Sequence, residues 1–307
     1  MFILAARLSL KYFSVGDLVR GKADGPIFWE TARAGLAIMP ANLSQRFYSD
    51  GGVIALNWIL PGTSGAVAAG LFTIARKISS LIQAIRLAFA YVLSPLASAL
   101  SRGAREEVQK IYGFATGVLV AIALPAGMVL AAAAPAILSL FGKQADPAVP
   151  AVMILVGSRI VEAMAGAAQP IQQVISSYRA QLVAANTGMI VAVIVGWFLL
   201  PEWGLTGMAI AVTAGLCTGA VLPVIQMWYD EGLTPFSDHS GRTLAITIGV
   251  AVVGAALAWL SNFLPDLISV PLTIALMLGS TWVACRFALP YEDRQALGKL
   301  GRALRLV

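Results

Sequence analysis

The sequence has 307 residues, of which 59% are hydrophobic and 12% are charged, and its formal net charge is +6. Soluble globular domains carry about 45–50% apolar and about 25% charged residues, so this composition excludes an ordinary soluble protein. It favours one helical unit that crosses the lipid bilayer several times, rather than the two soluble domains that length alone would suggest.

The residue types present argue against several classes of function. Lys and Arg are scattered through short loops and form no basic tail or face, so we expect no nucleic-acid partner. Cys217 and Cys285 lie inside apolar runs and His239 is the single histidine, so we expect no metal site. The sequence has no acidic cluster and no nucleotide-binding loop. We therefore predict no catalytic residue, no cofactor and no enzymatic activity.

Residues 1–30 form the lead segment of the chain. Its apolar start, residues 1–13, is interrupted by Arg7 and Lys11 and is too short to cross about 30 Å of hydrocarbon. We expect this segment to lie in the cytoplasm or at the membrane interface, or to be the end of a helix whose beginning is missing.

Eight apolar runs follow, each long enough for a membrane span, which needs about 20 residues at a rise of 1.5 Å per residue. The runs are residues 34–60, 66–98, 112–134, 149–175, 181–200, 205–228, 243–263 and 270–289. They are far longer than the roughly ten alternating residues of a barrel strand. The sequence therefore predicts an all-α membrane protein with about eight transmembrane helices.

The charges in the loops predict the orientation of these helices. Successive loops lie on alternate sides of the membrane. The chain ends and the loops on one side carry nearly all the basic residues outside the spans: Lys11, Arg20, Lys22, Arg33, Arg102, Arg105, Lys110, Arg179, Arg242, Arg286, Arg294, Lys299, Arg302 and Arg305. The loops on the opposite side carry Lys143 alone. By the positive-inside rule the basic side is cytoplasmic, so we expect a multi-pass protein of the cytoplasmic (inner) membrane with both termini in the cytoplasm.

Three of the predicted spans carry polar side chains along one helical face. These stripes are Asn42, Arg46, Ser49, Asp50 and Asn57 in the first span, Arg76, Ser79, Ser80, Gln83 and Arg86 in the second, and Arg159, Glu162, Gln169, Gln173 and Ser176 in the fourth. A charge in the middle of a membrane costs at least about 2.5 kcal/mol, so we expect each to face a cavity or a partner.

Two interpretations of the stripes stay open. Arg46–Asp50 at i, i+4 and Arg159–Glu162 at i, i+3 can be ion pairs that hold the bundle together. Alternatively, the stripes line an aqueous lumen for an anionic substrate, because their basic side chains, with Lys77 beside them, outnumber the acidic ones.

Individual residues refine these interpretations. Arg86 lies near the cytoplasmic end of its span, where we expect it to snorkel towards water. Arg76 and Lys77 lie inside an apolar run and need an anionic partner, either Asp50, Glu162 or a ligand. Spans 112–134, 243–263 and 270–289 have almost no polar side chains, and we expect them to face lipid.

Four stretches of the chain resemble a known family. Residues 34–40 (AGLAIMP) lead into a polar-striped helix, and residues 68–78 (AAGLFTIARKI), 93–98 (LSPLAS) and 201–211 (PEWGLTGMAIA) follow in order. They resemble the seventh span and the recurrent hairpins of polysaccharide and oligosaccharide lipid-carrier flippases. These flippases belong to the multidrug/oligosaccharidyl-lipid/polysaccharide exporter superfamily.

The resemblance implies a domain organisation. Family members have two six-helix lobes around a central cavity, often with two extra C-terminal helices. Residues 31–230 would form the second lobe, residues 231–290 the two additional transmembrane helices, and residues 291–307 a cytoplasmic tail. A first lobe is missing, so the chain is a fragment, has a truncated start, or pairs with a separate first-lobe chain.

The resemblance also implies a function, the translocation of a polyprenyl-pyrophosphate-linked glycan, with a polysaccharide assembly complex as a further partner. Arg46, Arg76, Lys77 and Arg159 would attract the pyrophosphate, Asn42, Gln83, Gln169 and Gln173 would contact sugars, and Asp50 and Glu162 would line the same lumen. Two alternatives are a cation-coupled multidrug antiporter of the same superfamily and a non-transporting membrane scaffold or remnant.

Overall fold

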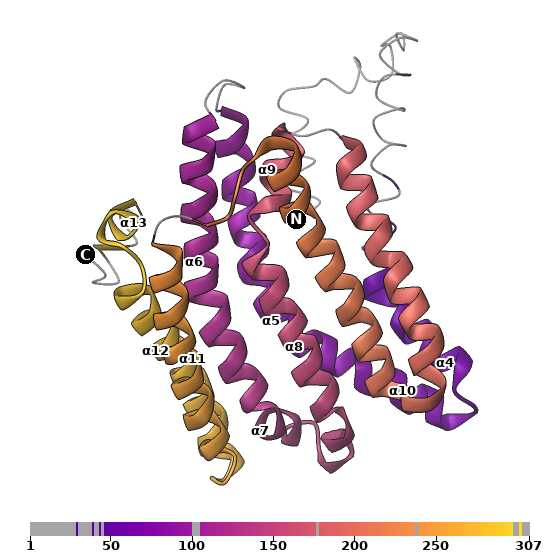
Figure 1. The fold of residues 1–307 in the computed structure, drawn as a ribbon. Helices are drawn as coiled ribbons and strands as arrows, with labels where there is room; N and C mark the ends of the chain where they lie inside the picture. Colours follow the sequence, from indigo (N-terminus) through magenta and orange to yellow (C-terminus); the bar gives the residue numbers. More distant parts are fainter. Residues whose placement is uncertain are drawn as a thin grey trace, which may run out of the picture.

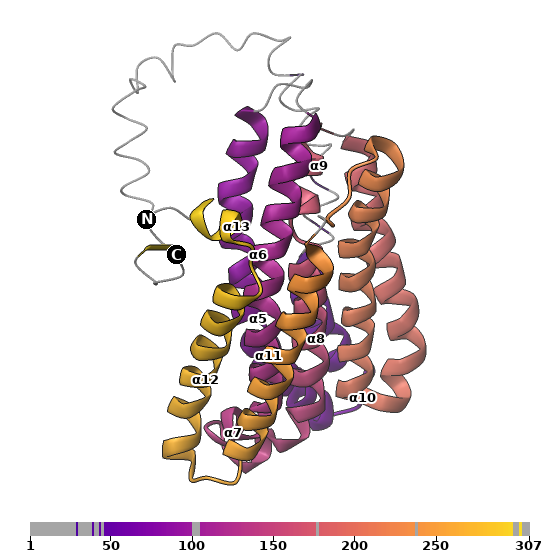
Figure 2. The ribbon, with the colours of Figure 1, turned by 60° about the vertical axis from the view of Figure 1, so that its left-hand side comes forward.

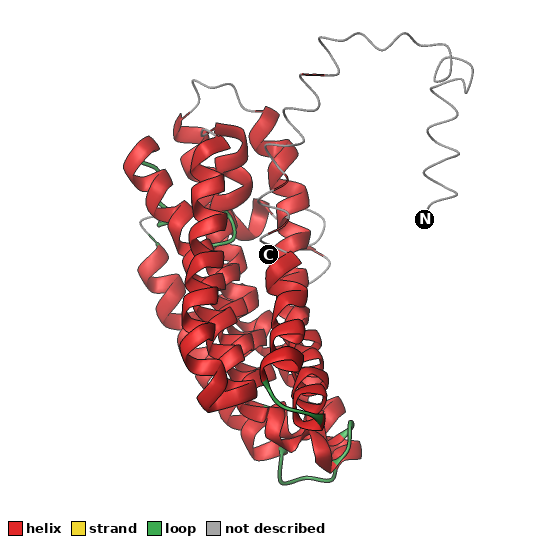
Figure 3. Ribbon diagram, turned by 90° about the vertical axis from the view of Figure 1, so that its right-hand side faces the viewer, coloured by secondary structure: helices red, strands yellow, loops and turns green. Residues whose placement is uncertain are grey.

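The computed structural model describes residues 29, 39, 43, 46–99, 105–175, 178–236, 239–296 and 301–302. Within these ranges every regular element is a helix, and the long helices lie side by side in one bundle, joined by short loops (Figures 1 and 3). The prediction of an all-α protein is therefore confirmed.

The helices follow the predicted apolar runs closely. They are η1 (Phe47–Gly51), α4 (Gly52–Ile59), α5 (Thr63–Ala99), α6 (Arg105–Ala132), α7 (Ala134–Ser139), η2 (Lys143–Ala148), α8 (Val149–Met164), α9 (Ala168–Ile175), α10 (Tyr178–Glu231), α11 (Ser240–Ser261), α12 (Asp266–Phe287) and α13 (Tyr291–Ala296). Here η1 is a π-helix and η2 a 3₁₀-helix.

Six helices in the described part of the chain are long and apolar enough to cross a membrane, which makes this a multi-pass membrane protein. One of them, α10, contains two predicted spans. Its backbone turns at Gly204, whose φ of 49° is one that glycine adopts readily, and Figure 1 shows the two arms running antiparallel. Counting both arms gives seven of the eight predicted spans. The remaining predicted span, residues 34–60, is described only in part, and its described part contains η1 and α4.

The two arms of α10 pack tightly where they leave the turn. A Cβ atom on Gly207 would collide with the carbonyl oxygen of Leu199, so the position admits no side chain. The residues around Gly204 thus form a tight turn between the predicted spans 181–200 and 205–228.

The helix ends that carry basic residues gather at one end of the bundle. The guanidinium of Arg105, at the start of α6, donates to the backbone oxygen of Glu231 at the end of α10. Thr243 Oγ1, at the start of α11, donates to the oxygen of Ala288, just after α12, over 2.9 Å. The segment containing Lys143 lies at the opposite end (Figure 1). The predicted alternation of the spans agrees with this arrangement.

Helix α6 lies at the centre of the bundle, which corrects one expectation from the sequence. Of its most apolar 18-residue stretch, 67% is buried inside the protein, against 28% for α11 and 17% for α12. Figure 2 shows α11 and α12 on one side of α5, α6 and α8, and α10 on the other. The peripheral positions of α11 and α12 agree with the prediction that they face lipid, whereas the same prediction for 112–134 is wrong.

The physical reason is that an apolar helix suits a protein core as well as it suits lipid. Ala123 and Ala126 of α6 belong to the main core with α5 and α8, whereas Ala121 belongs to a separate buried cluster with Ala284 and Leu289. Small side chains on several faces let neighbouring helices approach α6 from both sides.

We predict that Ala121→Phe destabilises the purified protein by about 1–3 kcal/mol, because the ring overpacks a fully buried position. Ala256 of α11 is exposed, so Ala256→Phe adds the same bulk towards lipid and should change stability by less than about 0.5 kcal/mol. Thermal unfolding in detergent measures both. Equal losses would contradict the central position of α6.

Candidate functional site

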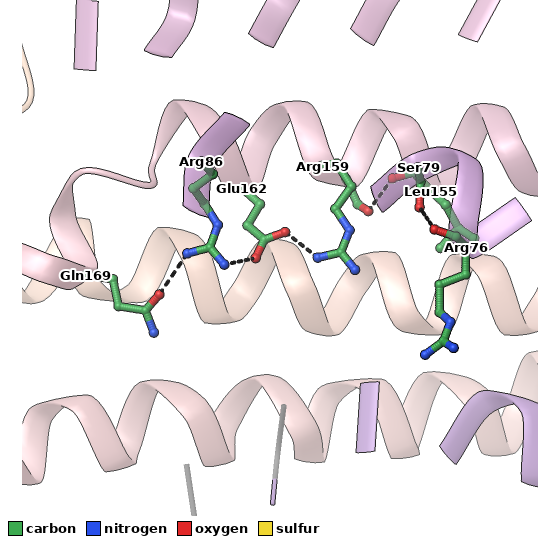
Figure 4. A network of polar contacts seen from close by, with 8 residues as sticks. Arg76, Ser79, Arg86, Leu155, Arg159, Glu162 and Gln169 are labelled. Carbon is green, nitrogen blue, oxygen red and sulfur yellow. Dashed lines mark hydrogen bonds and ion pairs between the residues drawn. The ribbon is translucent and has the colours of Figure 1, made fainter. Parts of the chain in front are cut away.

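Two of the three predicted polar stripes face each other across the contact between α5 and α8. Arg76, Ser79, Gln83 and Arg86 recur at steps of three and four residues along α5, which places them on one side of that helix. Arg159 and Glu162 lie on α8. Figure 4 shows Gln169, Arg86, Glu162 and Arg159 in a row, with Arg76 beyond Arg159.

The centre of the row is one carboxylate held between two guanidinium groups. Glu162 Oε1 lies 3.0 Å from Arg86 Nη2, and Glu162 Oε2 lies 2.5 Å from Arg159 Nη1. Arg86 Nη1 also donates to Gln169 Oε1 over 3.1 Å. The side chains of Arg86, Glu162 and Arg159 are only 6%, 12% and 9% exposed. The predicted Arg159–Glu162 ion pair is present, and Arg86 joins it from another helix.

A break in the helix allows this arrangement. Between the end of α8 and the start of α9 the backbone forms a turn at residues 165–167. Gly166 in this turn lies against Arg86, because a Cβ there would come within 2.6 Å of Arg86 Cγ. The glycine makes room for the arginine stem, and the turn brings Gln169 of α9 to the guanidinium.

The row lines a cavity of about 80 Å³. Its polar lining comes from Gln83, Arg86, Arg159, Glu162, Gln169 and Gln181, and both arms of α10 close it with small residues such as Ala184 and Gly219. A cavity needs about 10–15 Å³ to hold one water, so this one admits a small polar group but not a sugar chain. Two guanidinium groups against one carboxylate give it an excess positive charge.

A second, larger cavity of about 350 Å³ lies beside the first, and Ala165 lines both. Its walls are mainly apolar and come from α6, α8, α10 and α11, including Val120, Val161 and Val224. One charged side chain, Asp293 of α13, also lines it. Burial and the neighbouring Glu292 raise the pKa of the Asp293 carboxyl, whereas His239 lowers it. A polar cavity and an apolar one thus adjoin on α8 and α10.

Asp50 forms an ion pair with Arg76 of α5, and not with Arg46, as the sequence had suggested. Its Oδ1 lies 3.4 Å from Arg76 Nη1, whereas Arg46 is exposed. Asp50 lies in the π-helix Phe47–Gly51, which leads directly into α4, and α4 packs against α5, the helix that carries Arg76. This pair is more open than the buried network, since the Asp50 side chain is 57% exposed.

The structure separates the remaining predicted site residues. Gln83 is half-buried at the cavity, Lys77 and Gln173 are exposed, and Asn42 lies outside the described residues. The turn at residues 165–167 interrupts the stripe of the fourth span, so Gln173 is not continuous with Glu162. Arg76 does find one of the anionic partners expected for it, Asp50.

The expectation that Arg86 snorkels to water is wrong, because the residue is 5% exposed and bound to Glu162 and Gln169. In the sequence, the position of Arg86 on the same helical face as Gln83 was the feature that indicated a contact with other polar side chains. Sequence reasoning also missed Gln181, which lines the cavity, and Gln172, whose amide donates to Gln226 Oε1 over 2.8 Å.

Comparisons of this chain with protein-family models, with curated proteins and with solved structures find no match.

We predict that Gly166→Ala lowers the stability of the protein by about 1–3 kcal/mol, because the added methyl displaces Arg86 from Glu162. Gly157 of α8 has open space where its Cβ would lie, so Gly157→Ala is the matched control and should be neutral or stabilising. Thermal unfolding in detergent compares the two. A Gly166→Ala variant as stable as Gly157→Ala would contradict the close contact with Arg86.

Proposed function

We propose that the chain forms one lobe of a flippase that carries a polyprenyl-pyrophosphate-linked oligosaccharide across the cytoplasmic membrane. The observation that supports this most is the pair of adjoining cavities, one cationic and one apolar, inside a multi-pass bundle. A lipid-linked pyrophosphate has the same two parts, an anionic group and an apolar chain. The resemblance of residues 34–40, 68–78, 93–98 and 201–211 to this family points the same way.

Arg86 and Arg159 suit the pyrophosphate. A guanidinium presents a planar set of donors that binds two oxygens of a phosphate at once, and it stays charged when buried. Both arginines line the polar cavity, and the excess positive charge there attracts an anion. Arg76 extends the row at the edge of the network, where its partner Asp50 is more exposed.

The apolar cavity suits the lipid. Burying an apolar chain against apolar walls is favourable by about 25 cal/mol per Å² of contact removed from water. The cavity of about 350 Å³ holds part of a prenyl chain, and the remainder would lie in the surrounding bilayer.

The amides that line the polar cavity suit hydroxyl groups of the first sugar, whose ring would lie outside this small cavity. Gln83 and Gln181 offer both donors and acceptors, which is what sugar hydroxyls require. The glycan itself is too large for the cavity and would extend beyond it, towards a partner lobe or an assembly complex. Translocation breaks no covalent bond, so the proposed function needs no catalytic residue.

The basic loops support a cytoplasmic position for the end of the bundle that carries Arg105, Lys110 and Arg242. A lipid-linked glycan assembled in the cytoplasm would then enter from the basic end. Electrostatic attraction by these loops also raises the local concentration of an anionic lipid.

Deletion of the chain from cells that produce it should cause lipid-linked glycan to accumulate inside and surface polysaccharide to disappear. Restoring the chain with Arg86→Gln or Arg159→Gln should leave export at least tenfold below that with the native chain, at equal protein level. Lys143 is exposed in η2, at the opposite end of the bundle from the basic loops, and lines neither cavity, so Lys143→Gln is the matched control and should export normally.

Normal export after deletion, or with both cavity variants, would refute the proposed function. The same cells distinguish the antiporter alternative, because sodium-dependent efflux of a cationic dye that requires the chain would favour it. That mechanism relies on buried carboxylates free to bind a cation. The buried Glu162 is instead held by two arginines, which argues against it.

A further inference from the structure

We infer that Glu162 acts as an internal substitute for the phosphate of the substrate. In this structure its carboxylate forms an ion pair with Arg86, and an arriving phosphate takes the place of the carboxylate on that guanidinium. This goes one step beyond the proposed function and rests on it, because the phosphate of that substrate is taken as the arriving anion.

The contacts of Glu162 are those that a phosphate would make. A carboxylate and a phosphate both offer a guanidinium two oxygens in one plane, so the same donors bind either group. Glu162 uses one oxygen for Arg86, at 3.0 Å, and the other for Arg159, at 2.5 Å. The two anions therefore compete for one set of donors.

The arginines still have unused donors. Arg86 and Arg159 are 5% and 8% exposed, and the Nε atom of each has no hydrogen-bond partner among the described residues. A buried donor without a partner destabilises the protein, and more so when it is charged. Glu162 contacts the terminal nitrogens of both arginines but makes no hydrogen bond to either Nε atom, so acceptors for these have to come from another group. A pyrophosphate brings several more oxygens than a carboxylate does.

The two ion pairs of Glu162 are not equivalent. Arg159 lies three residues before it on the same helix, so this pair persists when helices move. Arg86 lies on α5, and its contact with Glu162 connects α5 to α8. Gln169 already binds Arg86 from α9 and is placed to share it with a ligand.

A phosphate on Arg86 therefore releases one contact between α5 and α8, while Glu162 stays with Arg159. Binding of the substrate head group thus changes the connection between two spans that line the cavity. Such a change gives the ligand different contacts in the two states, which is what a ligand needs to shift a conformational equilibrium.

The test is the affinity of the purified full chain for inorganic pyrophosphate, measured by calorimetry in detergent at fixed ionic strength. Glu162→Gln should bind pyrophosphate at least tenfold more tightly than the native chain, because the competing charge is gone. Arg86→Gln should bind at least tenfold more weakly. Asp230 is an exposed acid at the end of α10, so Asp230→Asn removes the same charge elsewhere and should stay within twofold.

Unchanged or weaker binding by Glu162→Gln would overturn the inference, since a carboxylate that only holds α5 and α8 together does not compete with a ligand. An equal gain in Asp230→Asn would also overturn it, because the gain would then come from overall charge. If Glu162→Gln does not accumulate, Glu162→Asp decides. Its shorter side chain keeps the charge but loses reach to Arg86, so binding should tighten severalfold, and no tightening contradicts the exchange.

This experiment uses neither glycan nor lipid, so its result is separate from that of the export test. Tighter pyrophosphate binding by Glu162→Gln with normal export by Arg86→Gln would uphold the exchange and refute the proposed substrate. Export that depends on Arg86, without tighter binding by Glu162→Gln, would uphold the function and refute the exchange.

Discussion

Two arginines and one glutamate buried among apolar helices impose the constraint on which the rest of the bundle depends. Moving an ion from water into a low-dielectric interior costs several kcal/mol, so Arg86 and Arg159 are tolerable only where acceptors reach them. Glu162 and Gln169 supply these acceptors, and they fix how α5 packs against α8 and α9. The break at residues 165–167, with Gly166 against the stem of Arg86, follows from the same need. One acid for two bases also leaves an excess of positive charge in the cavity, and the proposed preference for anions rests on this excess.

The division between polar and apolar chemistry runs along α8. Arg159 and Glu162 face the small polar cavity, whereas Val161 faces the larger apolar one, and Ala165 lines both. Because neighbouring residues on a helix point in different directions, one helix can present a charged face and an apolar face to two cavities. The proposed substrate, an amphiphile with an anionic head, is divided into a charged and an apolar part in the same way. Helix α6 supports it from behind, since its small side chains let α5, α8, α11 and α12 pack closely around one central helix.

Much of the fold follows from contiguous stretches of sequence. The length of an apolar run determines whether it can cross a membrane, and the charge of a loop favours one side of it, so both can be read without knowing any distant contact. The apolar runs accordingly match the helices from α5 to α12. Helical periodicity likewise placed Arg76, Gln83 and Arg86 on one face, and it paired Arg159 with Glu162 on α8.

Contacts between distant segments were decided only by the tertiary structure. Arg86 pairs with Glu162, 76 residues away, and Asp50 pairs with Arg76, 26 residues away, instead of with Arg46 on its own helix. Nothing local distinguishes a buried arginine near a helix end from one that snorkels to water. The sequence could not show that α6 is central, since an apolar helix has the same sequence pattern whether lipid or protein surrounds it. The sequence determined which residues are polar, apolar or small and where the spans lie, because those properties are local. The structure decided which charges meet, because that depends on how the spans pack in three dimensions.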